Sequence, residues 1–262
     1  SSLGSERVMF EACQMGTLEV AYGTTSVLAN FDPNLKVLDL PFLFADEATA
    51  REAITGELGA AAAADLENYG LINLTYMENG IRHVTNSSHP VNTPDDLAGL
   101  KIRTMENDVH MSSFEHLGAS PTPMAFTELF TALQQGTVDA EGNTFSLLND
   151  AKHTEVLKYA VNSEHNYSMH VLLMNKKKWD SLTPEQQKIL REAAKEANDW
   201  QRKESVVLEE KAGQAFRDRG IKIHMLTDAE RAELKAKTRP AYEKFAKEVP
   251  ADILQLLEET QK

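Results

Sequence analysis

Residues 183–220 read TPEQQKILREAAKEANDWQRKESVVLEEKAGQAFRDRG and predict one uninterrupted helix of about 35 residues. Thr183 followed by Gln186 is a capping-box pattern, and Pro184 occupies the first helical position. Gly220 supplies a left-handed stop, and the segment between is rich in good helix formers. At 1.5 Å per residue such a helix spans about 50 Å, which is longer than one small domain is wide.

A coiled-coil arm is the alternative interpretation of this segment. Its apolar residues form only a loose stripe, without the sustained Leu or Ile heptads that a coiled coil needs. A helix that crosses two domains fits better, and 262 residues suffice for two modest domains. The residues of the stripe are Ile189, Ala193, Ala197, Trp200 and Val207.

The composition is typical of a soluble globular protein, with 42% hydrophobic and 26% charged residues. The longest candidate for an apolar run, Ala60–Ala64, is far shorter than the ~18–20 residues of a membrane span. With 27 Lys plus Arg against 40 Asp plus Glu, the net charge of −13 argues against nucleic acid and anionic membrane surfaces as partners. A small anion is still an acceptable ligand, because local arginines set the sign of a site within the ~8 Å screening length.

Short apolar runs alternate with segments of helical period, which predicts an α/β protein. Three threonines mark helix starts: Thr93, Thr183 and Thr227. No linker rich in Pro, Gly or Ser is visible, so we expect the chain to cross between domains through ordered elements. The candidate strands are Val37–Leu43, Leu71–Tyr76, Ile81–Thr85, Leu100–Thr104, Met169–Met174 and Ile221–Met225.

Signatures of catalysis and metal binding are scarce. Nucleophile-elbow, phosphate-loop, dinucleotide-binding and zinc-protease motifs do not occur in the sequence. The closest histidine pairs lie six and five residues apart, which fits neither one helix face nor zinc spacing. We therefore expect no catalytic residue, no metal and no cofactor. Cys13 is expected to be a small buried hydrophobe, and Asp139 and Glu141 are expected to be solvated acids.

Two arginines lie in short apolar strands, where α/β folds place ligand residues. Arg82 belongs to the run 80–84, GIRHV, and Arg103 to the run 100–104, LKIRT. A planar guanidinium matches a carboxylate with two parallel hydrogen bonds. The other interpretation is a surface ion pair worth ~0–1 kcal/mol, and spacing alone favours it.

Four ordered segments resemble the solute-binding proteins of tripartite ATP-independent periplasmic (TRAP) transporters, of the dicarboxylate-receptor type. These segments are 38–44, LDLPFLF; 80–82, GIR; 92–103, NTPDDLAGLKIR; and 124–139, MAFTELFTALQQGTVD. The third segment is the most specific. The resemblance covers nearly the whole chain and includes the long helix.

The resemblance implies a two-lobed α/β periplasmic binding-protein fold, with a ligand cleft between the lobes and the long helix spanning both. We expect residues 1–79 and 169–208 to form lobe I, and residues 80–168 and 209–262 to form lobe II. Proteins of this kind are not enzymes. They bind a small organic acid in the periplasm by hinge closure and deliver it to the membrane subunits of the transporter. We expect a monomer that neither enters the membrane nor binds nucleic acid.

The resemblance also implies the substrate-binding residues. Arg103 is expected to pair with the ligand carboxylate, and Arg82 and Asn143 are expected in the same cleft. The remaining expected contacts are one wall position, two first-lobe positions and a position that contacts ligand in some members: Phe126, Thr24, Thr25 and His165.

The chain departs from the family pattern at one edge of this site. Many members read G-Q-E-N-P where residues 140–144 read AEGNT, which keeps Asn143 but introduces Gly142. The departure affects what the resemblance implies about the ligand more than it affects membership of the family. Two arginines with threonines and an Asn suit an acid with several hydroxyls, such as a uronate, or with a second carboxylate, and we favour a sugar acid.

Two other classes of function stay open at this stage. One is a hydrolase or lyase on a similar two-lobed scaffold, and the other is the ligand-sensing domain of a signalling system. Family members usually run to about 300 residues and begin with a strand and a helix before the step matched by residues 3–6, LGSE. We therefore expect this chain to lack the first strand and helix of lobe I.

Overall fold

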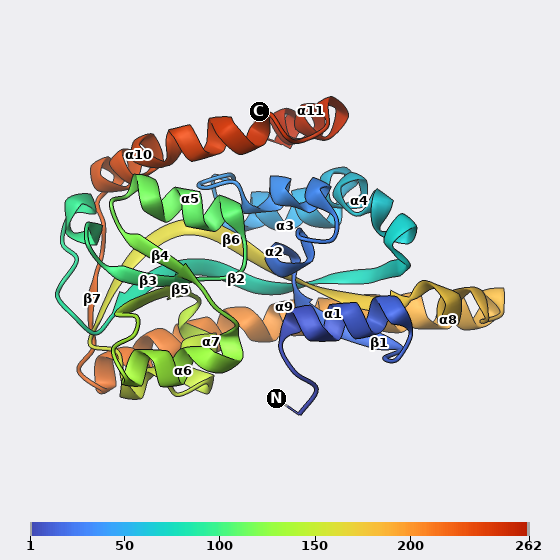
Figure 1. The fold of residues 1–262 in the computed structure, drawn as a ribbon, viewed down its shortest axis with the longest axis horizontal. Coiled ribbons are helices and arrows are strands. Elements are labelled where there is room, and N and C mark those ends of the chain that lie inside the picture. Colours follow the sequence, from blue (N-terminus) through green and yellow to red (C-terminus); the bar gives the residue numbers. More distant parts are fainter. Residues whose placement is uncertain (1, 261–262) are drawn as a thin grey trace.

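Two long strands run through the centre of the molecule and carry the rest of the sheet (Figure 1). The computed structural model describes residues 2–260, in which β2 (Leu71–Asn86) pairs antiparallel with β6 (Tyr159–Asn175). One end of this pair carries β1 (Val20–Thr24). The other end carries the remaining strands: β5 (Ala140–Asn143), β3 (Lys101–Thr104), β4 (Ser120–Pro123) and β7 (Lys222–His224).

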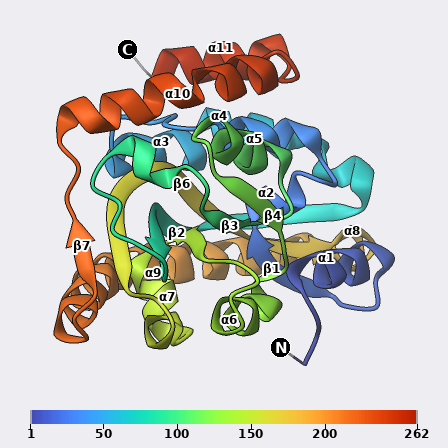
Figure 2. The ribbon, with the colours of Figure 1, turned by 60° about the vertical axis from the view of Figure 1, so that its left-hand side comes forward.

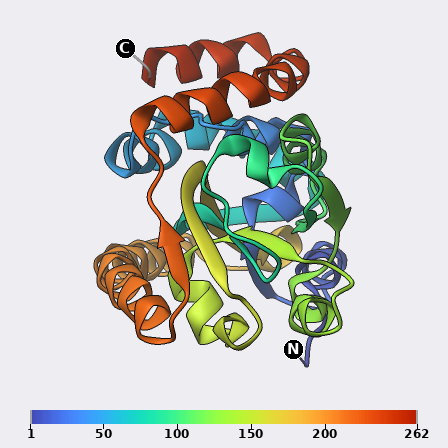
Figure 3. The same ribbon diagram turned by 90° about the vertical axis from the view of Figure 1, so that its left-hand side faces the viewer.

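Helices cover both faces of the sheet (Figures 2 and 3). On the side towards the C-terminus, α10 (Asp228–Ala246) and α11 (Ala251–Thr260) form an outer layer, and the long α9 (Pro184–Asp218) covers the opposite face. The other helices are α1 (Glu6–Met15), α2 (Thr25–Leu28), α3 (Glu47–Thr55), α4 (Glu57–Ala62), α5 (Asp108–His116), α6 (Phe126–Gln134), α7 (Phe145–Asp150) and α8 (Lys176–Asp180). The 3-10 helices are η1 (Pro33–Asp39), η2 (Ala64–Tyr69), η3 (Pro94–Leu97) and η4 (His153–Glu155).

The start of α9 follows the predicted capping box. The Thr183 backbone N–H donates to Gln186 Oε1 at 2.9 Å, and the Gln186 N–H donates to Thr183 Oγ1 at 3.2 Å. The expected apolar stripe does not face the core, because Trp200 is 65% exposed and Ile189 is 55% exposed. The helix instead packs through small and polar residues and one aromatic: Ala194, Asn198, Ala212, Gly213 and Phe216.

The expected strands Leu71–Tyr76 and Ile81–Thr85 are two halves of β2. The pairing with β6 continues between them through register shifts, one of them between Glu78 and Gly80. Gly80 has φ +113°, a conformation that glycine adopts without a steric penalty. The strand therefore continues without interruption to Arg82.

The expected strand Val37–Leu43 is wrong. Its first residues belong to the 3-10 helix η1, which starts with Pro33 and is capped by Asp32 Oδ1 accepting the Asn34 N–H at 3.1 Å. A short apolar run that is buried on all sides does not distinguish strand from helix. The other expected strands occur as β3, part of β6 and β7, whereas β1, β4 and β5 were not foreseen.

Candidate functional site

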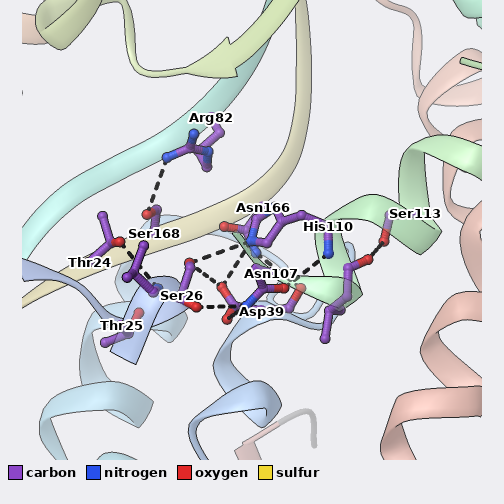
Figure 4. Close-up of polar contacts among 12 residues, drawn as sticks. Thr24, Thr25, Ser26, Asp39, Arg82, Asn107, His110, Ser113, Asn166 and Ser168 are labelled. Carbon is purple, nitrogen blue, oxygen red and sulfur yellow. Dashed lines mark hydrogen bonds and ion pairs between the residues drawn. The ribbon is translucent and has the colours of Figure 1, made fainter. Parts of the chain in front are cut away.

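Arg82 is a buried cation that is only partly satisfied. Its side chain, 3% exposed, extends from β2. Nη1 donates to Ser168 Oγ at 3.5 Å (Figure 4), Nη2 donates to the Gly142 carbonyl, and Nε has no partner. Burial and then the neighbouring Arg103 lower the pKa of Arg82 to about 10, so the group stays charged at neutral pH.

Arg103 is equally buried and lies close by on β3. Its Nε donates to the Met124 carbonyl at 2.9 Å, and its guanidinium lies 5.9 Å from the centre of the Phe126 ring. Burial lowers the pKa of Arg103, while the nearby Glu141 and Glu6 raise it. Among residues 2–260, neither Arg82 nor Arg103 has a carboxylate within 4.0 Å.

β5, which carries Asn143, lies between the strands of the two arginines because it pairs with both. Asn143 lies opposite His83 on β2, one residue from Arg82, and Glu141 lies opposite Arg103 on β3. Asn143 is 2% exposed, and its Oδ1 accepts the Thr144 N–H at 3.1 Å. We call Arg82, Arg103 and Asn143 the arginine site. The half-buried Phe126 lies beside it under Arg103.

Glu141 is not the solvated acid that the sequence predicted. Its side chain is fully buried, and Oε1 accepts a hydrogen bond from His153 Nδ1 at 2.5 Å. The error arose because a four-residue strand with two polar residues looks like a surface segment until it is placed between two other strands.

Glu6 is a member of this region that sequence reasoning missed. Its carboxylate accepts the Thr24 backbone N–H at 2.9 Å and the Thr24 hydroxyl at 3.1 Å. Burial raises the pKa of Glu6, while Thr24 and the charges of Arg103 and Arg82 lower it. Glu6 therefore connects Thr24 to the arginine site, by hydrogen bonds to Thr24 and by its charge interaction with the two arginines. Thr25 instead donates to the Met169 carbonyl at 3.2 Å inside the fold.

His165 lies against the same part of β5. Its Nδ1 lies 2.7 Å from Ser163 Oγ, and its Nε2 has no partner. A Cβ added at Gly142 would lie 2.9 Å from that Nε2, so only glycine fits beside this ring without a shift. Burial and then Arg82 lower the pKa of His165 well below its usual value, which keeps the imidazole neutral.

A second polar cluster, the Asp39 network, consists of Ser26, Asp39, Asn107 and His110 (Figure 4). Asp39 accepts from the Ser26 hydroxyl at 2.5 Å, from Asn107 Nδ2 at 2.9 Å and lies 3.0 Å from His110 Nε2. Serine, histidine and aspartate meet here, but the Ser26 hydroxyl and the Asp39 carboxylate both lie next to the same ring nitrogen, His110 Nε2. A catalytic triad needs the acid on Nδ1 and the nucleophile on Nε2, so this cluster is not one.

Within residues 2–260, no group of three or more His, Cys, Asp or Glu side chains is arranged to hold a metal ion. In the same residues no helix is long and apolar enough to cross a membrane. Cys13 is fully buried, as predicted.

Comparison with known proteins decides the family. Residues 1–248 match the bacterial extracellular solute-binding protein family 7, DctP. The chain belongs to this family. The 2,3-diketo-L-gulonate-binding periplasmic protein of Escherichia coli K12 is 37% identical over 264 residues, which cover 100% of this chain and 80% of that protein.

Two solved structures share the fold at high similarity. The sugar acid binding protein of Advenella mimigardefordensis, in complex with galactonate, is 34% identical with a TM-score of 0.94, covering 99% of this chain and 85% of that chain. A TRAP periplasmic solute-binding protein from Polaromonas sp. JS666, bound to D-erythronate, is 40% identical with a TM-score of 0.93. The match covers 98% of this chain and 84% of that chain. The predicted family, two-lobed fold, non-enzymatic class and periplasmic location are confirmed.

Proposed function

We propose that this DctP-family receptor binds a hydroxylated organic acid, in first place a sugar acid, and delivers it to TRAP membrane subunits. The observation that carries the proposal is the pair of buried guanidinium groups without a carboxylate partner in residues 2–260. A buried cation is costly unless it is paired, so a ligand carboxylate stabilises the closed protein. The relatives support the hydroxylated class, since their ligands are galactonate, erythronate and diketogulonate.

The arginine site would hold the carboxylate, with Arg103 as its main partner and Arg82 and Asn143 beside it. Phe126 would cover an apolar edge of the ligand. The remaining proposed contacts, to hydroxyl groups or to the walls of the site, are Thr24, Thr25 and His165, to which the structure adds Glu6 as a partner of Thr24.

Hinge closure would bring together lobe I, residues 1–79 and 169–208, and lobe II, residues 80–168 and 209–262. The continuous β2 and β6 provide the connection, and their register shifts near Gly80 and Arg82 provide places where it can bend. α11, which this division assigns to lobe II, packs against α3 and α4 of lobe I, so the end of the chain also connects the two lobes. We further propose that the receptor acts as a monomer, which light scattering after size exclusion would test.

A thermal-shift screen of organic acids tests the ligand class. Sugar acids such as galactonate and erythronate should raise the melting temperature, because a ligand at a hundred times its Kd stabilises by about 2.7 kcal/mol. Mass spectrometry of the recovered ligand should show it unchanged. A screen in which only simple dicarboxylates raise the melting temperature would overturn the sugar-acid proposal.

A further inference from the structure

Glu141 is the one acid that β5 places against the arginine site. It lies opposite Arg103 in the pairing of β5 with β3, so both side chains project to the same side of the sheet. Its charge acts on both guanidinium groups and raises the pKa of Arg82 and of Arg103. It does so without lying within 4.0 Å of either. The Glu141 carboxylate is therefore buried on the same side of the sheet as Arg103 and acts on both positive charges.

His153 holds this carboxylate in place. It donates from Nδ1 to Glu141 Oε1 at 2.5 Å, while Glu141 Oε2 has no partner. The His153 ring stacks on Phe126 with a centroid distance of 5.3 Å and lies 5.9 Å from Phe130. The contact with His153 thus fixes the direction of the Glu141 carboxylate.

The other acids near the arginines contribute less. Burial raises the pKa of Glu6, which favours its uncharged form, and its oxygens are already used by Thr24. Asp39 is occupied by three hydrogen-bonding neighbours in its own network. Of the acids that act on both guanidinium groups, Glu141 raises their pKa the most, so the two positive charges face one principal negative charge.

We propose that Glu141, held by His153, is a specificity-determining residue that makes the arginine site select an acid with one carboxylate over the same acid with two. A second ligand carboxylate would meet the buried charge of Glu141 with no remaining cation to pair with it. This inference rests on the proposed function, since it assumes that a carboxylate binds at the arginines. It also extends the proposed function, because hydroxylated acids occur with one carboxylate and with two.

Galactonate and galactarate are matched probes for this idea, because they differ only in the oxidation state of the last carbon. Calorimetric titration of the wild-type protein should give a lower Kd for galactonate. In Glu141→Gln, which keeps the shape and an acceptor for His153, the ratio of the galactarate Kd to the galactonate Kd should fall on the order of tenfold. Glu141→Asp keeps the charge and should retain the wild-type preference.

Glu78→Gln is the control, because Glu78 is also a buried carboxylate, pairs with Arg51 and plays no part in the arginine site. Its Kd ratio should equal that of the wild type. A wild-type protein that prefers galactarate overturns the inference without any variant, and so does an unchanged ratio in folded Glu141→Gln. Both of these results leave the proposed function standing. Absence of binding to either acid overturns the proposed sugar-acid ligand itself.

Discussion

The Asp39 network and the arginine site are both buried, polar and charged, yet they differ in how their hydrogen bonds are filled. In the network, Asp39 is surrounded by Ser26, Asn107 and His110 at 2.5 to 3.0 Å. In the arginine site, Arg82 Nε has no partner and neither guanidinium meets a carboxylate within residues 2–260. A polar cluster that satisfies itself stabilises the fold, whereas one that leaves charged donors open stabilises a complex.

The largest expected effect is on ligand affinity at Arg103. Arg103→Lys keeps the charge but loses the planar fork, so affinity for the cognate acid should fall a hundredfold or more. The melting temperature of the free protein should change little, because the guanidinium makes few bonds without ligand. Calorimetry measures the affinity, and Arg51→Lys is the control because that arginine pairs with Glu78 instead. Near wild-type affinity in Arg103→Lys would remove Arg103 from the site.

Asp39→Asn should show the opposite pattern. It removes a charged acceptor from three neighbours, so the free energy of unfolding should fall by about 2 kcal/mol, with a smaller effect on affinity than Arg103→Lys. Urea denaturation measures the loss. Asp46→Asn makes the same chemical change at an exposed helix cap, where Asn and Asp cap equally well, and should be nearly neutral. Equal losses in both variants would mean that the network does not stabilise the fold.

The same contrast explains what the sequence could predict. Capping at Thr183 and Thr227 was predictable because the partners lie three residues away. The arginines could be proposed from their strands and from the family resemblance. Glu6 and the Glu141–His153 pair could not, because their contacts depend on where β5 and α1 lie in the folded protein.

A third prediction concerns buried histidines outside both clusters. Burial and then Arg231 lower the pKa of His83 to about 3, whereas an unfolded histidine titrates near 6.5. Below about pH 6.5 the unfolded chain binds more protons at this histidine than the folded protein does. The contribution of His83 to the free energy of unfolding is therefore fully present above about pH 6.5 and is lost as the pH falls towards about 3. Between pH 7 and 5.5, His83 should contribute roughly 1 kcal/mol to this fall.

His83→Phe tests this, because phenylalanine keeps the stacking on Phe145 and removes the titrating group. Denaturation at the two pH values should show a smaller fall for this variant than for the wild type. His116→Gln is the control, because it removes an exposed histidine that lies outside the stack on Phe145. The same fall in His83→Phe as in the wild type would assign the pH dependence to other groups, of which His165 is the first candidate.

The smallest expected effect lies at the start of α9, far from both clusters. Thr183→Ala removes the hydroxyl that accepts the Gln186 N–H at 3.2 Å, and should lower the free energy of unfolding by roughly 0.5–1 kcal/mol. Ligand affinity should not change, because this hydrogen bond is exposed and involves no charged group of the arginine site. Thr183→Ser restores the hydroxyl and should recover most of the stability. If serine and alanine were equally destabilising, the threonine would stabilise the helix through its methyl group, and the hydrogen bond of its hydroxyl would contribute nothing.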